Sequence, residues 1–184
     1  ILPKSFNCML AGTTGAKKSL YAMQLGLCLA NGEQGFCGGK ISQPYKVLYV
    51  DTEAGQNEVT RRYKKITSHM DWKGQSNWVM MSKKGRMTDI WEDVHRALNR
   101  YTPDLLIIDC LYNTSAEKEF SKSHKISSVI EQLTEIKTRQ NVTIYCVHHM
   151  NKGGHEIGLH KDRMSGASAL QNWVEHLILM TDTN

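Results

Sequence analysis

The sequence lacks the features that mark membrane, secreted and repetitive proteins. Its 184 residues contain no apolar run near the ~18 residues that a membrane-spanning helix requires, and residues 1–10 lack the long apolar stretch of a secretory signal. It also contains no internal repeat and no low-complexity linker. A chain of this length can bury a sizeable core, so we expect one domain over residues 1–184, without a membrane partner.

Paired cysteines are also missing. Five cysteines are present, and none of them forms a C-x-x-C pair. Most lie within apolar runs, which indicates free buried thiols and a reducing, cytoplasmic compartment. The chain begins at Ile1 rather than at methionine, so we expect it to be a piece of a longer protein. The net charge of +5 permits a polyanionic partner without demonstrating one.

Short apolar runs alternate along the chain with stretches of helical periodicity. This alternation predicts an α/β fold in which a mainly parallel sheet is flanked by helices, and such sheets bind ligands at the carboxyl ends of their strands. We predict strands at residues 8–10, 47–50, 78–81, 105–108, 142–147 and 176–180, and helices at residues 20–30, 57–68, 89–100, 125–139 and 165–173.

A glycine-bearing loop lies between the first predicted strand and the first predicted helix. That order is the context of a phosphate-binding P-loop, in which backbone N–H groups and the helix N-terminus face the phosphates. We expect Lys18 to contact the β- and γ-phosphates of ATP and Ser19 to hold Mg²⁺. The loop comprises Gly12, Thr13, Thr14, Gly15, Ala16, Lys17, Lys18 and Ser19.

One position of this loop departs from the P-loop pattern. The pattern has a glycine directly before its lysine, whereas this chain has Lys17. Because Lys17 carries a Cβ atom, it cannot approach a phosphate as closely as glycine can. At the turn into the helix, however, we expect ordinary φ and ψ angles to suffice. We therefore expect nucleotide binding to be retained, with hydrolysis that is slow or needs a neighbouring subunit.

Carboxylates follow two further predicted strands. Asp109 directly follows residues 105–108, where P-loop NTPases carry the carboxylate of the Mg²⁺ site. The next residue, Cys110, cannot activate the attacking water, so we predict that Glu53 does. Asp51 is an alternative base, but at the end of its own strand we expect it to anchor the loop through hydrogen bonds. The other reading of Glu53, a solvated loop acid, stays open.

Two histidines, His148 and His149, end the next predicted strand. One of them could contact the γ-phosphate and report its loss to the following loop, while buried histidines without a role are the alternative. A zinc site is disfavoured, because no cysteine or acid lies at ligand spacing from these two residues or from His155 and His160.

Together these segments resemble the RecA/DnaB superfamily of P-loop ATPases, and within it the RepA-like branch of AAA-type ATPases, which includes hexameric plasmid replicative helicases. The resemblance rests on the loop ending at Lys18 and Ser19 and on the segments VLYVDTEAG, LLIIDC, VHHMNK and RMSGASAL. It implies a RecA-like fold, Glu53 as the catalytic base, and His149 as the γ-phosphate sensor.

The resemblance also implies partners. Residues 111–122 and 151–163 are similar in position to loops that contact single-stranded DNA, although ordinary solvated loops explain their charges equally well. A ring-shaped homo-oligomer, such as a hexamer, is expected to supply an arginine finger in trans. The charged residues in question are Lys118, Lys122, Lys152 and Lys161, with Arg163 as the candidate finger.

The sequence therefore predicts an ATP-hydrolysing motor domain: a DNA-dependent ATPase or helicase that serves replication or mobilisation of a plasmid or mobile element. Two other functions stay open. One is a non-motor nucleotide-dependent switch, a regulatory ATPase with a protein partner. The other is a P-loop small-molecule kinase, which is disfavoured because nothing resembles an arginine-rich lid.

Overall fold

A computed structural model describes residue 2 and residues 4–33, 39–85, 89–111, 123–150 and 168–182. Six strands form one sheet in the order β3-β2-β4-β5-β1-β6, and all of the neighbouring strands run parallel. The prediction of a parallel sheet is confirmed. The strands are β1 (Asn7–Gly12), β2 (Val47–Asp51), β3 (Trp78–Ser82), β4 (Leu105–Asp109), β5 (Thr143–His149) and β6 (His176–Met180).

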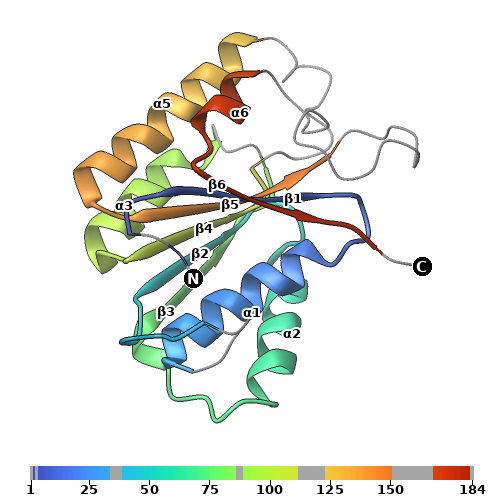
Figure 1. Cartoon of the computed structure of the whole chain (residues 1–184). Helices are drawn as coiled ribbons and strands as arrows, with labels where there is room; N and C mark the ends of the chain where they lie inside the picture. The colour runs from blue at the N-terminus through green and yellow to red at the C-terminus, as the bar shows by residue number, and fades with distance from the viewer. Residues whose placement is uncertain are drawn as a thin grey trace.

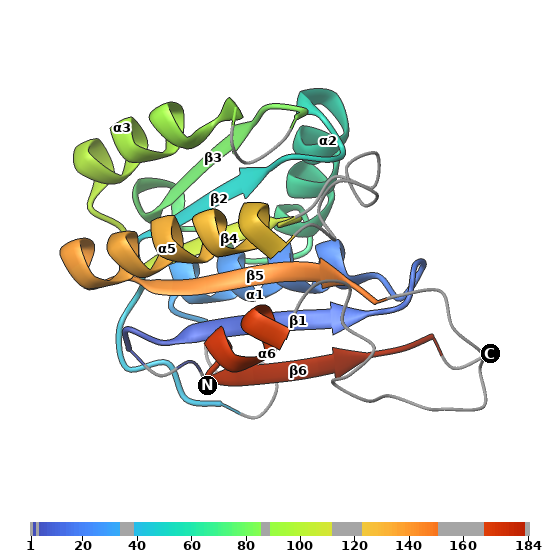
Figure 2. The ribbon, with the colours of Figure 1, turned by 90° about the horizontal axis from the view of Figure 1, so that it is seen from above.

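Helices cover both faces of the sheet (Figure 1). Helices α1 and α2 lie on one face and helices α3, α5 and α6 lie on the other, so the molecule has three layers. Figure 2, seen from above, shows α5 and α6 lying over the sheet. The helices are α1 (Lys18–Asn31), α2 (Gln56–Thr67), α3 (Trp91–Tyr101), α5 (Ser123–Gln140) and α6 (Ser168–Trp173), with a 3-10 turn η2 (Gln75–Asn77).

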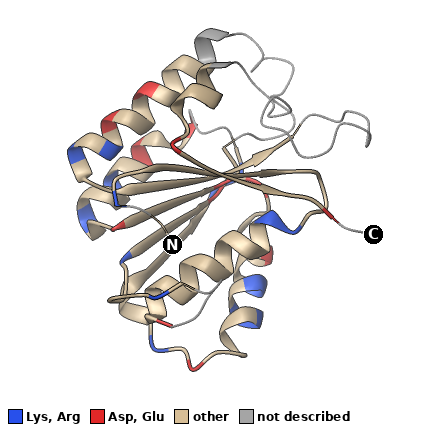
Figure 3. Ribbon diagram, viewed as in Figure 1, with Lys and Arg blue, Asp and Glu red and all other residues tan. Residues whose placement is uncertain are grey.

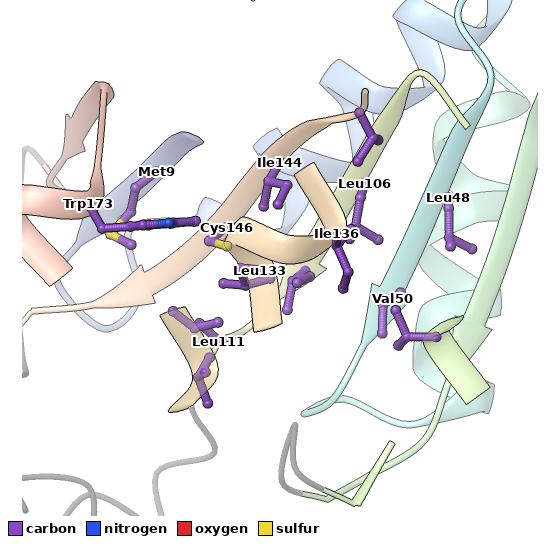
Figure 4. Packing of buried hydrophobic residues seen from close by; sticks show 14 of the residues in the cluster. Met9, Leu48, Val50, Leu106, Leu111, Leu133, Ile136, Ile144, Cys146 and Trp173 are labelled. Carbon is purple, nitrogen blue, oxygen red and sulfur yellow. The ribbon is translucent and has the colours of Figure 1, made fainter. Parts of the chain in front are cut away.

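Each strand sends alternate side chains into two separate cores, because successive side chains of a strand point to opposite faces. Leu106 of β4 belongs to the core under α3, α5 and α6, whereas its neighbour Ile107 belongs to the core over α1 and α2. Figure 4 shows Leu133 and Ile136 of α5 beside strand residues of the first core. Covering both faces explains why the strands are continuous apolar runs rather than alternating ones.

The register of the sheet aligns the carboxyl ends of its strands, so the residues at those ends lie close together. Gly12 pairs with His149 across β1 and β5, and Asp51 pairs with Asp109 across β2 and β4. All of these residues lie at the carboxyl ends of their strands. Charged residues are otherwise confined mainly to the helices and the turns, as Figure 3 shows. Among the helices of the described residues, none is long and apolar enough to cross a membrane.

Candidate nucleotide-binding site

The glycine-bearing loop connects β1 to α1 as predicted, and two of its glycines are required by its shape. A Cβ atom on Gly12 would lie 2.0 Å from the carbonyl oxygen of Met180 in β6, so no larger residue fits beside that strand. Gly15 has a φ of +91°, in a region that side chains rarely allow. The loop therefore curls tightly between β6 and the start of α1.

Lys17 occupies the position before α1, with φ of 59° and ψ of 22°. These are left-handed angles, so the expectation that ordinary φ and ψ angles suffice at this position is wrong. The loop must reverse direction here before the helix begins, and this is the turn for which the P-loop pattern supplies glycine. For a residue with a Cβ atom, the left-handed conformation costs about 1–2 kcal/mol. Lys17 is exposed and makes no side-chain cap for the helix.

Lys18 is the first residue of α1, and its side chain folds back across the loop. Its Nζ atom donates hydrogen bonds to the carbonyl oxygens of Gly12, at 3.0 Å, and Thr13, at 2.6 Å. Burial lowers the pKa of Lys18, while the nearby Cys110, Glu53 and Asp109 act in the opposite direction. The ammonium group is thus held at the loop and could exchange these carbonyls for phosphate oxygens.

A hydroxyl and a carboxylate meet next to this lysine. The Oγ atom of Ser19 donates a hydrogen bond to Oδ1 of Asp109 at 3.0 Å, and the hydroxyl of the buried Tyr49 donates to Oδ2. Burial raises the pKa of Asp109, although the hydrogen bonds from Tyr49 and Ser19 oppose that rise. Hydroxyl and carboxylate oxygens are the hard ligands that Mg²⁺ prefers, so the residues present fit this ion.

Glu53 lies just beyond β2, and its side chain contacts residues at the ends of β4 and β5. Its Oε2 atom accepts a hydrogen bond from the thiol of Cys110 at 3.3 Å and lies 3.4 Å from Nε2 of His149. Because an ionised carboxylate only accepts, this contact requires the proton on Nε2 of the imidazole. The hydrogen bond from His149 is the main cause that lowers the pKa of Glu53. Glu53 is therefore ionised at neutral pH, with 40% of its side chain exposed against 16% for His149.

Asp51 anchors the turn after β2, as predicted. Its carboxylate accepts hydrogen bonds from the backbone N–H groups of Ala54 at 3.0 Å and Gly55 at 2.9 Å, and from the hydroxyl of Ser82 at 2.7 Å. Both oxygens of Asp51 are engaged in this way, so it holds the segment that carries Glu53 rather than competing with Glu53 for a water.

These groups surround a cavity of about 590 Å³. Five basic residues line it, which suits a polyphosphate better than a neutral ligand. Figure 3 shows basic residues at the start of α1 and on α2 on the same side of the molecule. The lining residues are Thr14, Gly15, Lys17, Lys18, Ser19, Leu20, Asp51, Glu53, Ala54, Glu58, Arg61, Arg62, Lys84, Asp109 and His149.

Comparison with known proteins gives a consistent assignment. The sequence profile of the AAA domain family matches residues 1–155. The chain belongs to the AAA domain family. This AAA domain is a P-loop NTPase domain, which confirms the predicted RecA-like α/β class, whereas membership of the RepA-like helicase branch stays a prediction. No curated protein matches the chain.

Among solved structures, the AAA domain is similar to a KaiC-like protein from the hyperthermophilic archaeon Pyrococcus horikoshii. The two share 14% sequence identity with a TM-score of 0.65, and the match covers 98% of this chain and 73% of the archaeal one. At this identity the likeness concerns the fold alone.

The AAA domain brings most of the predicted site residues to one cavity. The P-loop residues Thr14, Gly15, Lys17, Lys18 and Ser19 lie there together with Glu53, Asp109 and His149. Gly12 and Ala16 are buried behind the loop surface. The predicted DNA-contacting residues Lys118, Lys122, Lys152 and Lys161, the candidate finger Arg163, and the histidines His155 and His160 lie outside the described residues.

Some residues in and beside the cavity were not predicted as site residues, and Tyr49, Arg61 and Arg62 are among them. Tyr49 reads in the sequence as one more apolar strand residue, yet its hydroxyl reaches Asp109 from the neighbouring strand. Arg61 and Arg62 read as part of a basic helix, and both line the cavity. The only signal in the sequence is a hydroxyl in an otherwise apolar run and a pair of arginines soon after Glu53.

Proposed function

We propose that this AAA domain binds ATP together with Mg²⁺ and hydrolyses the bond between its β- and γ-phosphates. The observation that carries the proposal is the hydrogen bond between Ser19 and Asp109 beside the P-loop lysine. A hydroxyl at the start of α1 and a carboxylate at the end of β4 meet at one point, as a phosphate-bound Mg²⁺ requires. Both oxygens belong to rigid elements, so little rearrangement is needed to bind the ion.

The binding roles divide among neighbouring groups. In the proposal, the backbone N–H groups of the loop and the N-terminus of α1 bind the phosphates, and Lys18 leaves its carbonyl partners to contact the β- and γ-phosphates. Ser19 and Asp109 would hold Mg²⁺, which neutralises phosphate charge when it is bound. Arg61 and Arg62, which also line the cavity, would add positive charge near the nucleotide.

Glu53 is the proposed general base. The water oxygen attacks the γ-phosphorus, the bond to the oxygen bridging the β- and γ-phosphates breaks, and Glu53 accepts the proton from water. Support comes from its exposure on the cavity and from its ionised state, which the hydrogen bond from His149 favours by lowering the pKa of Glu53. His149 is the proposed sensor, because its Nε2 atom contacts Glu53 and it also lines the cavity.

Substitutions separate binding from turnover. Lys18→Ala is expected to abolish binding of a fluorescent ATP analogue, since it removes the phosphate-contacting ammonium group. Glu53→Gln is expected to bind the analogue but to stop phosphate release. Glu58→Gln is the matched control, because Glu58 lines the same cavity but bonds Arg61 and Arg62 instead of facing Cys110 and His149. Normal turnover by Glu53→Gln would refute the assignment of the base.

Coupling to single-stranded DNA, and assembly into a ring with Arg163 as a trans-acting finger, stay predictions that rest on the resemblance to RecA and DnaB relatives. Their test is phosphate release with and without single-stranded DNA. Stimulation that declines with added salt would support the motor function, since phosphate contacts are weakened by salt. Hydrolysis without stimulation or salt-sensitive DNA binding would favour the nucleotide-dependent switch with a protein partner.

A further inference from the structure

Glu53, Cys110 and His149 form a cluster of three different metal-ligating groups at the edge of the cavity. Their carboxylate oxygen, thiol sulfur and imidazole nitrogen all lie within 4.8 Å of one another. We propose that this cluster binds a borderline-soft divalent metal ion, for which Zn²⁺ is the probe, and that the bound ion inhibits ATP hydrolysis. The inhibitory part rests on the proposed role of Glu53, whereas the metal site does not.

The spacing of the ligand atoms fits a tetrahedral ion. Zinc bonds of about 2.0 Å to nitrogen and oxygen and about 2.3 Å to sulfur place neighbouring ligand atoms about 3.3–3.5 Å apart. In the structure, the Sγ atom of Cys110 lies 3.3 Å from Oε2 of Glu53, and Nε2 of His149 lies 3.4 Å from the same oxygen. Two of the three ligand separations therefore match without movement, and all three ligand atoms lie within 4.8 Å of one another.

The chemistry of the cluster differs from that of the neighbouring pair, Ser19 and Asp109. That pair offers only oxygen atoms, which suit Mg²⁺, while a thiolate and an imidazole suit zinc or cobalt. Binding would release the thiol proton of Cys110 to solvent, and the thiolate and carboxylate would together balance the charge of the ion. Three protein ligands would leave the fourth position of a tetrahedral ion open to water or a phosphate oxygen.

A metal ion in this cluster would occupy the atoms that the proposed hydrolysis needs. The Oε2 atom of Glu53 would donate its electrons to the ion rather than accept the proton of the attacking water. His149 would bind the ion through Nε2, with the proton of the neutral ring now on Nδ1, and could no longer donate to Glu53. Inhibition is therefore expected even when the nucleotide remains bound, and it should be reversed by a zinc-selective chelator that leaves Mg²⁺ in place.

The sequence disfavours a different zinc site, one built on His148, His149, His155 and His160, because no cysteine or acid lies at ligand spacing from them. The ligands of the proposed site come instead from the ends of three adjacent strands, β2, β4 and β5. Cys110 lies 57 positions from Glu53, and His149 lies 96 positions from it. Only the register of the parallel sheet brings them together.

Cobalt spectroscopy on the nucleotide-free protein tests the site directly. Co²⁺ is expected to give tetrahedral visible bands and a thiolate-to-cobalt charge-transfer band, which excess Zn²⁺ removes. Cys110→Ser should lose the charge-transfer band, and His149→Gln should bind at least about tenfold more weakly. Cys28→Ser is the matched control, because Cys28 is a buried thiol beside a different acid, Glu33, and should keep the full spectrum.

The outcomes separate this proposal from the proposed function. No charge-transfer band in the parent protein, or a band that persists in Cys110→Ser, would overturn the metal site. Should Cys110→Ser fail to fold by circular dichroism, unchanged cobalt affinity in His149→Gln would overturn it equally. Phosphate release titrated with Zn²⁺ tests the consequence: loss of most activity supports inhibition, and undiminished activity with zinc bound refutes it. A protein that binds cobalt through Cys110 but hydrolyses no ATP would contradict the proposed function alone.

Discussion

Replacing Lys17 by glycine should stabilise the nucleotide-free protein. Lys17 has left-handed backbone angles and an exposed side chain, so the substitution removes strain without removing packing. Removing the strain stabilises the folded protein by about 1–2 kcal/mol. The greater conformational freedom of glycine in the unfolded chain offsets about 0.4–1 kcal/mol of this gain. The net gain in the free energy of unfolding is therefore about 1 kcal/mol, which raises Tm by about 2–4 °C in a domain of this size.

Lys17→Ala is the control that isolates the backbone contribution. It removes the charge and the flexible side chain but keeps the Cβ atom, so it retains the strain of the left-handed conformation. Thermal and urea unfolding of the two variants and the parent protein, monitored by circular dichroism, measure the difference. Glycine is expected to be more stable than alanine by about 1 kcal/mol. Equal stability of the two variants would refute the argument that this position stores backbone strain.

The same two variants test what the side chain of Lys17 does for the nucleotide. If its ammonium group contacts the phosphates, both variants should bind ATP more weakly by a similar factor. If Lys17 is merely tolerated, both should bind as well as the parent protein. A large loss of affinity in both variants would make Lys17 a contact, and a loss confined to one of them would contradict either description.

Three further predictions concern the groups around the loop. Gly12→Ala should destabilise the protein by at least about 1–3 kcal/mol, because its Cβ atom would overlap the carbonyl of Met180, and urea unfolding measures the loss. His149→Ala should move the acid limb of the pH–rate profile to higher pH, because it removes the hydrogen bond that lowers the pKa of Glu53; an unmoved limb would contradict that role. Tyr49→Phe should raise the Mg²⁺ concentration needed for half-maximal phosphate release, since the carboxylate at the end of β4 loses its buried donor.

The fold and the order of the site groups could be predicted because each depends on short segments. Residues 105–108 are predicted to form a buried strand because all four are apolar. Asp109 then lies at the end of this strand because it is the next residue in the chain. Because ligands bind at the carboxyl ends of parallel strands, Lys18, Glu53 and His149 could be predicted to lie together at that end of the sheet.

What could not be predicted depends on contacts between strands. The register that sets Tyr49 and Cys110 beside the site arises from packing of the whole sheet, and no local pattern encodes it. The left-handed angles of Lys17 could not be predicted for a related reason. The backbone conformation there is imposed by the connection from β1 to α1, and the local preference of lysine does not reveal it.

The most direct test of the account is the rate of phosphate release from ATP bound to the protein with Mg²⁺, measured in a single turnover for the parent and for Glu53→Gln. The account predicts conversion of bound ATP by the parent protein and a rate lower by about 10²–10⁴ in the variant, with ATP still bound. Equal rates in the two proteins, or no conversion of bound ATP by the parent protein, would contradict it.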